Sequence, residues 1–189
     1  MSKSIYIYGF HSIEAQLNSN PECILNVFFQ SGRTDIRISK ITSILSNQKI
    51  SFSKINKNRL DQLTKYELHQ GVVAEVILPQ LPGHEALIEF VTKLSSNPLI
   101  LMLDSIQDPR NLGACLRCAN AAGVDCVVVN KDGSAPINAV VHKTSSGAIN
   151  QLKIFQVTNL VRTIKALKDK KLWVLGLDGT ASTSIYDVN

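Results

Sequence analysis

Residues 101–130 constrain the fold of this chain more than any other stretch. They read LMLDSIQDPRNLGACLRCANAAGVDCVVVN, an apolar run that leads through a polar turn into a helical segment and a second apolar run. Apolar runs of this kind are typical of central strands in a parallel sheet that helices cover on both faces. The order strand, helix, strand therefore predicts an α/β unit, with the N-terminus of its helix available to an anion.

The turn at Asp108-Pro109 sets where this helix begins, because proline fixes φ near the value of a turn or of a first helical residue. We expect Asn111 to be the N-cap, its side chain accepting from a backbone N–H of the first turn. Asp108 as the cap, with Pro109 at the first helical position, is the alternative register. Gly113 and Ala114 would leave the first turn bare to a ligand.

Arg117 is the one basic residue in the body of this helical segment. Side chains on a helix lean toward its N-terminus, so Arg117 is expected to reach back over the first turn. Asn111, Gly113 and Arg117 could then converge on one phosphate or ribose. The alternative is a surface arginine on an ordinary α/β helix.

The amino-terminal part of the chain alternates strands and helices, which predicts a small α/β domain in three layers. The expected strands are 5–9, 24–30, 50–54 and 71–76, and the expected helices run through 13–17, 36–46 and 56–65. We assign residues 1–76 to this domain.

A break containing Pro79, Pro82 and Gly83 separates it from a second α/β unit. Residues 77–97 form the linker and an amphipathic connecting helix at 84–96, which should pack on the second unit, residues 98–189. In that unit the expected strands are 98–104, 125–129, 152–157 and 172–178, and the expected helices are 111–122, 139–148 and one with Asn159 near its start.

Charge and hydropathy suit a nucleic-acid partner without proving one. The chain carries 20 Lys+Arg against 15 Asp+Glu, a net charge of +5, and its pI is about 9.1. No apolar run approaches the ~20 residues of a membrane span, and the amino terminus lacks a signal-peptide pattern. We therefore expect a cytoplasmic protein with no membrane partner.

Cys115 and Cys118 form a C-x-x-C inside the helical segment. No second pair and no histidine at ligand spacing accompany them, so we expect no metal. They should pack against the sheet as small hydrophobic residues.

A dinucleotide-binding dehydrogenase is the obvious competitor for a parallel α/β unit. It needs G-x-G-x-x-G between the first strand and its helix, whereas this chain offers SIQDPRNLGA with a single glycine. That alternative is excluded.

Four segments carry a resemblance to a known family. DPRNLGACLRCANAAGV (108–124) resembles the first signature of the SpoU-type RNA ribose 2′-O-methyltransferases, and HKTSSGA (142–148) resembles their Ser-x-Gly-Ala helix. YGFHSIEAQL (8–17) and LHQGVVAEV (68–76) are similar to the amino-terminal domain of the branch that methylates guanosine in 23S rRNA.

The resemblance implies S-adenosylmethionine-dependent 2′-O-methylation of a guanosine ribose in 23S rRNA. It assigns Arg117 to activation of the ribose 2′-hydroxyl. It assigns Asn111 to holding either Arg117 or the target ribose in place. A guanidinium stays protonated far above neutral pH, which favours Arg117 as an electrostatic clamp, but the sequence does not decide between a clamp and a base. Arg110, His142 and Lys143 are expected to contact RNA.

Other polar residues in these segments are expected to be structural. His11 and the turn at 69–71 should fix local turns, and Ser145, Ser146 and Gly147 should permit close helix packing.

Family members end in a trefoil knot that holds the cofactor, and knots are rare in proteins. This sequence ends at STSIYDVN, so we expect the knot to be incomplete, the chain to be inactive as written, and the homodimer to belong to the complete enzyme. The cofactor-binding residues left are Gly176, Leu177, Asp178 and Gly179. A tRNA 2′-O-methyltransferase and a non-catalytic RNA-binding protein remain alternatives.

Overall fold

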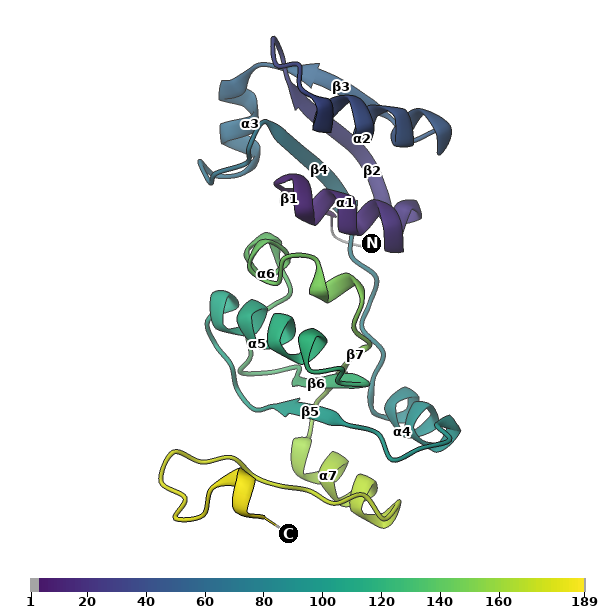
Figure 1. Ribbon diagram of the computed structural model, residues 1–189, viewed down its shortest axis with the longest axis vertical. Helices are drawn as coiled ribbons and strands as arrows, with labels where there is room; N and C mark the ends of the chain where they lie inside the picture. Colours follow the sequence, from purple (N-terminus) through teal and green to yellow (C-terminus); the bar gives the residue numbers. More distant parts are fainter. Residues whose placement is uncertain (1–3, 189) are drawn as a thin grey trace.

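The computed structural model describes residues 4–188, which form two α/β units stacked along the long axis of the molecule (Figure 1). The first unit contains four strands and three helices. Its elements are β1 (Ser4–Tyr8), α1 (Phe10–Ser19), β2 (Ile24–Gln30), α2 (Ile36–Asn47), β3 (Phe52–Ile55), α3 (Lys57–Leu63) and β4 (Val72–Ile77), with a 3₁₀ turn at Pro21–Cys23.

The sheet of the first unit has the strand order β1-β4-β2-β3, in which only β2 and β3 run parallel. Alternate residues of each strand face opposite sides, and two apolar clusters fill them. Ile13 of α1 and Ile41 of α2 pack on one face, and Leu60 of α3 packs on the other with Tyr8 and Val73. The predicted three-layer arrangement is therefore confirmed.

The second unit contains a parallel sheet, as predicted, and its described strands have the order β5-β6-β7. Its elements are α4 (His84–Lys93), β5 (Ile100–Leu103), α5 (Pro109–Ala121), β6 (Cys126–Asn130), α6 (Ala139–Thr144), β7 (Ile154–Val157) and α7 (Leu160–Asp169), with 3₁₀ turns at Ala148–Asn150 and Ile185–Asp187.

Helices cover both faces of this sheet. On one face Leu116 of α5 and Val141 of α6 pack on Val127 of β6. On the other, Leu87 of α4 packs with Val128 and with residues of β7 and α7. The connecting helix α4 thus packs on the second unit, as expected, although it ends at Lys93 rather than at residue 96.

The predicted strand at 172–178 is wrong. Residues 172–178 have no regular secondary structure, and Trp173 and Leu177 are 92% and 74% exposed. A strand requires a neighbouring strand to accept its backbone hydrogen bonds. The apolar pattern of this segment is that of a strand, but in the described part of the chain no strand pairs with it.

The predicted boundaries of two helices also need correction. The N-cap of α5 is Asp108, whose Oδ1 accepts from the Arg110 N–H at 2.8 Å, so the alternative register holds and Asn111 lies inside the first turn. Helix α6 ends at Thr144 rather than at residue 148, because Ser146 and Gly147 adopt φ 52° and φ 90°, left-handed conformations that stop a helix.

No helix within residues 4–188 has the length and apolar character needed to cross a membrane.

Candidate RNA site between the two units

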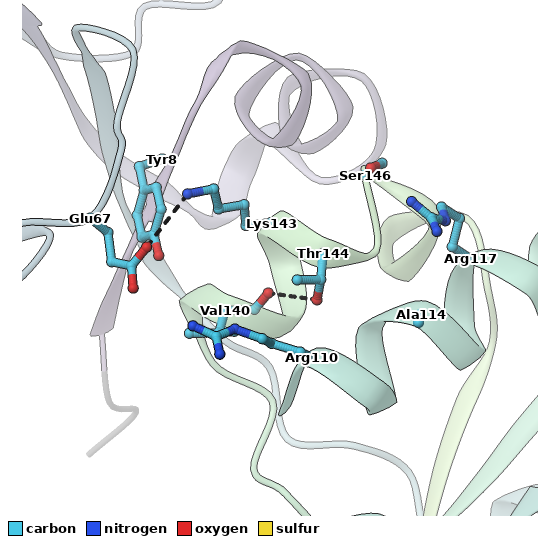
Figure 2. A pocket seen from close by; sticks show the side chains of 9 residues that line it. All are labelled: Tyr8, Glu67, Arg110, Ala114, Arg117, Val140, Lys143, Thr144 and Ser146. Carbon is cyan, nitrogen blue, oxygen red and sulfur yellow. Dashed lines mark hydrogen bonds and ion pairs between the residues drawn. The ribbon is translucent and has the colours of Figure 1, made fainter. Parts of the chain in front are cut away.

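A cavity of about 500 Å³ lies where the two units meet (Figure 2). Its walls come from the first unit, from α5, from α6, and from Ser146, which follows α6. The lining residues are Tyr8, Glu67, Arg110, Ala114, Arg117, Val140, Lys143, Thr144 and Ser146.

Helix α5 supplies one wall because Arg110, Ala114 and Arg117 recur at intervals of four and three residues, which places them on one helical face. Neither arginine has an ion-pair partner among residues 4–188. Two exposed guanidinium groups therefore flank a small alanine, which leaves room between them for a ligand.

Gly113 has a different role from the one expected. It is buried, and a Cβ built on it would overlap Thr144 of α6, lying 2.8 Å from the Thr144 Cβ and 3.1 Å from the Ser145 nitrogen. This glycine lets α5 and α6 approach each other and does not leave its backbone open to a ligand.

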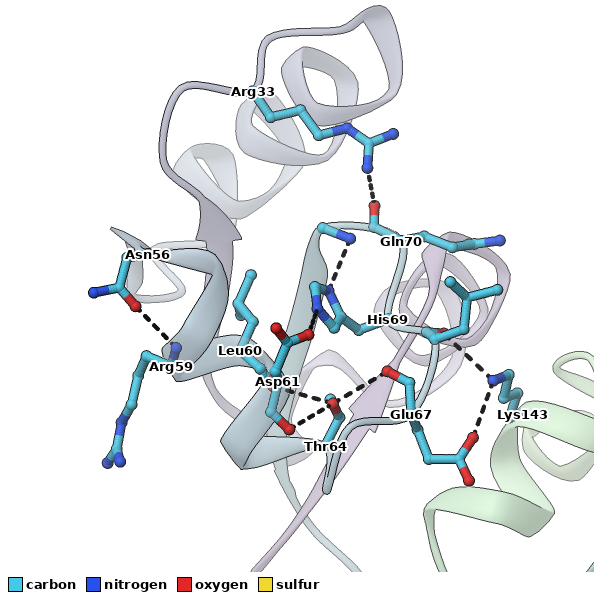
Figure 3. Close-up of polar contacts among 12 residues, drawn as sticks. Arg33, Asn56, Arg59, Leu60, Asp61, Thr64, Glu67, His69, Gln70 and Lys143 are labelled. Carbon is cyan, nitrogen blue, oxygen red and sulfur yellow. Dashed lines mark hydrogen bonds and ion pairs between the residues drawn. The ribbon is translucent and has the colours of Figure 1, made fainter.

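A hydrogen-bonded turn in the first unit holds the wall opposite α5 (Figure 3). The Gly71 N–H donates to His69 Nδ1 at 3.0 Å, and His69 Nε2 lies 2.9 Å from Asp61 Oδ1 of α3. Both ring nitrogens of His69 are thus engaged, which confirms its expected role in a turn. The turn follows Glu67 and Leu68 directly, so it fixes the segment that presents the Glu67 carboxylate.

Lys143 connects the two units at the cavity. Its Nζ lies 3.5 Å from a carboxylate oxygen of Glu67, donates to the Leu68 carbonyl at 3.3 Å, and lies 4.9 Å from the centre of the Tyr8 ring. Three contacts hold one flexible side chain, so the ammonium group has a defined position.

Helix α1 docks on α6 beside the cavity. The Ser12 hydroxyl donates to the His142 carbonyl at 3.4 Å, and a Cβ built on Gly147 would lie 2.7 Å from the Cβ of Ala15. Close packing at Gly147 is therefore confirmed, and the partner is a helix of the first unit.

His142 does not face the cavity. Its side chain lies in the interior at 3% exposure, and neither ring nitrogen has a hydrogen-bond partner among the described residues. Burial lowers the pKa of His142 to about 4, so its ring is neutral near pH 7. The expected contact between His142 and RNA is therefore corrected, because a buried neutral ring offers no charge to a phosphate.

Electrostatics in the cavity combine three cations with one anion. Burial and the Glu67 carboxylate raise the pKa of Tyr8, while Arg110 acts in the opposite direction. Arg110 and Glu67 both lie close enough to act on the Tyr8 hydroxyl, although they come from different units. The site suits an anionic ligand that also carries hydrogen-bond donors.

The structure thus brings together three of the residues singled out in the sequence, Arg110, Arg117 and Lys143. Asn111 is exposed and does not line this cavity. Sequence reasoning missed Tyr8, although YGF at 8–10 was among the matching segments. It also missed Glu67, which directly precedes another such segment.

The segment Gly176, Leu177, Asp178 and Gly179 lies apart from the cavity lining. Asp178 Oδ1 accepts from the Thr180 N–H at 2.7 Å and from the Thr180 hydroxyl at 2.5 Å, a local turn that lowers the pKa of Asp178. A Cβ built on either Gly176 or Gly179 would meet nothing within 4 Å.

The four cysteines are free. Cys115 packs partly buried against the sheet cluster, as predicted, but Cys118 is exposed and the expectation for it is wrong. In the part of the chain that the structure describes, no three His, Cys, Asp or Glu side chains gather as metal ligands would.

Comparison with known proteins defines the class. The SpoU rRNA methylase family matches residues 98–189, and a domain described as RNA 2′-O ribose methyltransferase substrate binding matches residues 6–82. The chain belongs to the SpoU rRNA methylase family.

Individual relatives are also similar over most of the chain. A protein of Haemophilus ducreyi named 23S rRNA (guanosine-2′-O-)-methyltransferase is 42% identical over 95% of this chain and 73% of its own length. A protein of the same name from Pseudomonas aeruginosa is 39% identical over 100% of this chain and 76% of its own length. This chain therefore spans about three quarters of the curated relatives that it matches.

Solved structures show the same fold. An RNA 2′-O ribose methyltransferase aligns with a TM-score of 0.73 and 20% identity over 100% of this chain and 68% of its own. The SpoU methyltransferase AviRb from Streptomyces viridochromogenes, solved with AdoMet, aligns with a TM-score of 0.68 and 15% identity over 89% of this chain and 59% of its own.

Proposed function

We propose that this protein takes part in S-adenosylmethionine-dependent 2′-O-methylation of a guanosine ribose in 23S rRNA. The observation that carries the proposal is the cavity in which Arg110, Arg117 and Lys143 meet between the two units. The names of relatives at 39% and 42% identity supply the RNA class and the nucleoside.

RNA carries one negative charge per nucleotide, so a cavity lined by three cations and one carboxylate favours an RNA ligand. Arg117 has a planar guanidinium that can bind two oxygens at once. We assign it to holding the phosphate and stabilising the negative charge that develops on the ribose 2′-oxygen. A role as literal base is disfavoured because the guanidinium stays protonated.

A second basic surface in the first unit supports RNA binding. Arg33 and Arg37 lie 5.7 and 5.6 Å from the centre of the Phe10 ring and line a shallow hollow with Gln70. Phe10 itself is buried, and Arg33 is ion-paired with Asp35 at 3.0 Å, so the exposed Arg37 guanidinium is the cation that this surface offers most freely to RNA phosphates. It would extend the contact with RNA beyond the cavity.

S-adenosylmethionine supplies the methyl group when it is bound. The residues expected to hold it, Gly176, Leu177, Asp178 and Gly179, are exposed, and none lines a cavity described above. Two of them have open space around the Cα, so they do not form an enclosing wall. In this conformation they do not fit an adenosyl group. The structural support for the proposal therefore comes from the residues expected to contact RNA. The residues expected to activate and hold the ribose are Arg117 and Asn111, and the second of these lies outside the cavity.

The test is to map 2′-O-methylation in ribosomal RNA and tRNA from cells that lack the gene. We expect the loss of one 2′-O-methylguanosine in 23S rRNA and its return when the gene is supplied again. Loss from tRNA would instead support a tRNA methyltransferase, and unchanged methylation would support a non-catalytic RNA-binding protein. The proposed location is the cytoplasm, where ribosomal RNA is modified, and the proposed assembly is a homodimer of the complete enzyme.

A further inference from the structure

The cavity contains a charge of the wrong sign for a site that binds only phosphate. Glu67 projects its carboxylate into it and lies 3.5 Å from the Lys143 ammonium. A carboxylate repels a phosphate, so a site built only for the RNA backbone would gain nothing from Glu67. The pair instead offers an edge with two adjacent acceptors and a donor beside them.

We propose that Glu67 and Lys143 recognise the Watson–Crick edge of a guanine base held in this cavity. The inference rests on the proposed function and adds to it the residues that select the base. Both side chains are partly exposed, at 43% for Glu67 and 36% for Lys143, so a ligand can reach them without unfolding the wall.

The hydrogen-bond pattern of guanine matches this pair. Along its Watson–Crick edge guanine presents the exocyclic amino group and N1–H, which are donors, and then O6, which is an acceptor. A carboxylate accepts from the two donors and an ammonium group donates to O6. Adenine presents one acceptor and one donor in the same region, so its N1 lone pair would face the carboxylate and be repelled.

The structure positions both groups before any ligand binds. The Leu68 carbonyl and the Tyr8 ring hold the Lys143 ammonium, and the turn at His69 fixes the backbone next to Glu67. A site that is ordered in advance loses less conformational entropy on binding. A partly exposed ion pair contributes little to folding stability. We therefore assign the pair to recognition of a ligand.

The remaining walls suit the rest of a nucleotide. Arg110 extends from α5 past Val140 toward Glu67, and its planar guanidinium can stack on a base (Figure 2). Arg117 lies near Ser146, away from the Glu67–Lys143 pair, where a ribose or phosphate would sit. The volume of about 500 Å³ falls within the range of small-molecule sites, roughly 300–1,000 Å³.

The test uses the purified chain and three nucleotides, GMP, IMP and AMP, titrated at low salt and followed by two-dimensional NMR. We expect GMP to bind at least about tenfold more tightly than AMP, since a good bidentate pair discriminates by ~1–3 kcal/mol. IMP lacks the exocyclic amino group but keeps N1–H and O6, so its affinity should fall between the two. The shifted amide signals should include those of residues 67–69 and 143.

Glu67→Gln replaces one acceptor by a donor and should reduce the preference for GMP over AMP to less than about twofold. Glu89→Gln is the matched control, because Glu89 also pairs with a lysine, Lys93 at 2.5 Å, but lies on α4. The control should keep the preference of the unaltered chain.

Three results would overturn the inference: equal affinity for GMP and AMP in the unaltered chain, no GMP binding, or an unchanged preference in Glu67→Gln. Each can occur while the 23S rRNA methylation map still supports the proposed function. Conversely, a tRNA target would correct the proposed function, and a Glu67-dependent GMP preference would still stand.

Discussion

Acidification should destabilise this protein through His142, a buried side chain at the contact between the two units. Its ring is 3% exposed, and neither nitrogen has a partner among the described residues. Burial lowers its pKa from 6.5 to about 4. The folded protein therefore keeps the ring neutral under conditions in which the unfolded chain protonates it.

The sign and size of the effect follow from this difference in pKa. Between the folded value of about 4 and the unfolded value of 6.5, the unfolded state binds more protons, so the free energy of unfolding rises with pH. The contribution of the neutral His142 ring to the free energy of unfolding is complete above the pKa of the unfolded state. It is lost as the pH falls toward the pKa of the folded state. From about pH 7.5 to about pH 5 the loss attributable to His142 is about 2 kcal/mol.

The assay is urea unfolding at both pH values for the unaltered chain and for His142→Met. Methionine has a similar volume, does not titrate and adapts to irregular space. Other titrating groups contribute equally to both proteins, so the difference between their pH effects isolates His142. If the variant loses as much stability on acidification as the unaltered chain, the burial argument is refuted.

Three further outcomes are expected. Gly113→Ala should destabilise the fold by about 1–3 kcal/mol despite its better helix propensity, because the new methyl meets Thr144, and Thr144→Ala in the same chain should restore part of the loss in urea unfolding. Arg117→Lys, tested by supplying the altered gene to cells that lack it, should leave less than about a tenth of the 23S rRNA methylation with an unchanged melting temperature, because a point charge cannot replace a planar fork. A thiol reagent near pH 8 should modify the exposed Cys118 readily and reach Cys126 only after unfolding, since Cys126 is fully buried and burial raises its pKa to about 12; equal rates in the native protein would contradict this.

Hydrophobic pattern predicted most of the fold, because several of the observed strands, such as β5 and β6, are nearly continuous apolar runs. Strand β2 begins and ends where the sequence placed it, at residues 24 and 30. Segment 172–178 has the same apolar character and forms no strand. Local pattern reports only how well a segment would suit a sheet, whereas pairing depends on a neighbour that the segment itself does not contain.

The two helix boundaries failed for a related reason. Asn111 and Asp108 are both good N-cap residues, and proline at the first helical position favours the earlier one. The end of α6 depended on Ser146 and Gly147, which were recognised as packing residues but also take left-handed conformations. In each case the local sequence allowed two boundaries, and the apolar pattern alone did not decide between them.

The sequence predicted some residues of the candidate site and not others. Arg110 and Arg117 stood out because they lie on one helix within a short segment, where spacing alone fixes which face they share. Glu67 is separated from Arg110 by more than forty positions and belongs to the other unit, so no periodicity relates them. The two walls come together because α6 and the residues that follow it dock on β1 and α1, with Gly147 against Ala15.

The same docking links stability to recognition. His142 and Lys143 are neighbours on α6, one turned into the interior and the other into the cavity. A proton on His142 would need to be solvated, and the nearest way to solvate it is to separate α6 from α1, since the carbonyl of His142 accepts from Ser12 of that helix. Separation would also move Lys143 away from Glu67 and Leu68. Acid should therefore weaken the preference for GMP before it unfolds either sheet, and His142→Met should retain that preference at about pH 5. If both proteins lose the preference together, the two neighbouring residues act independently.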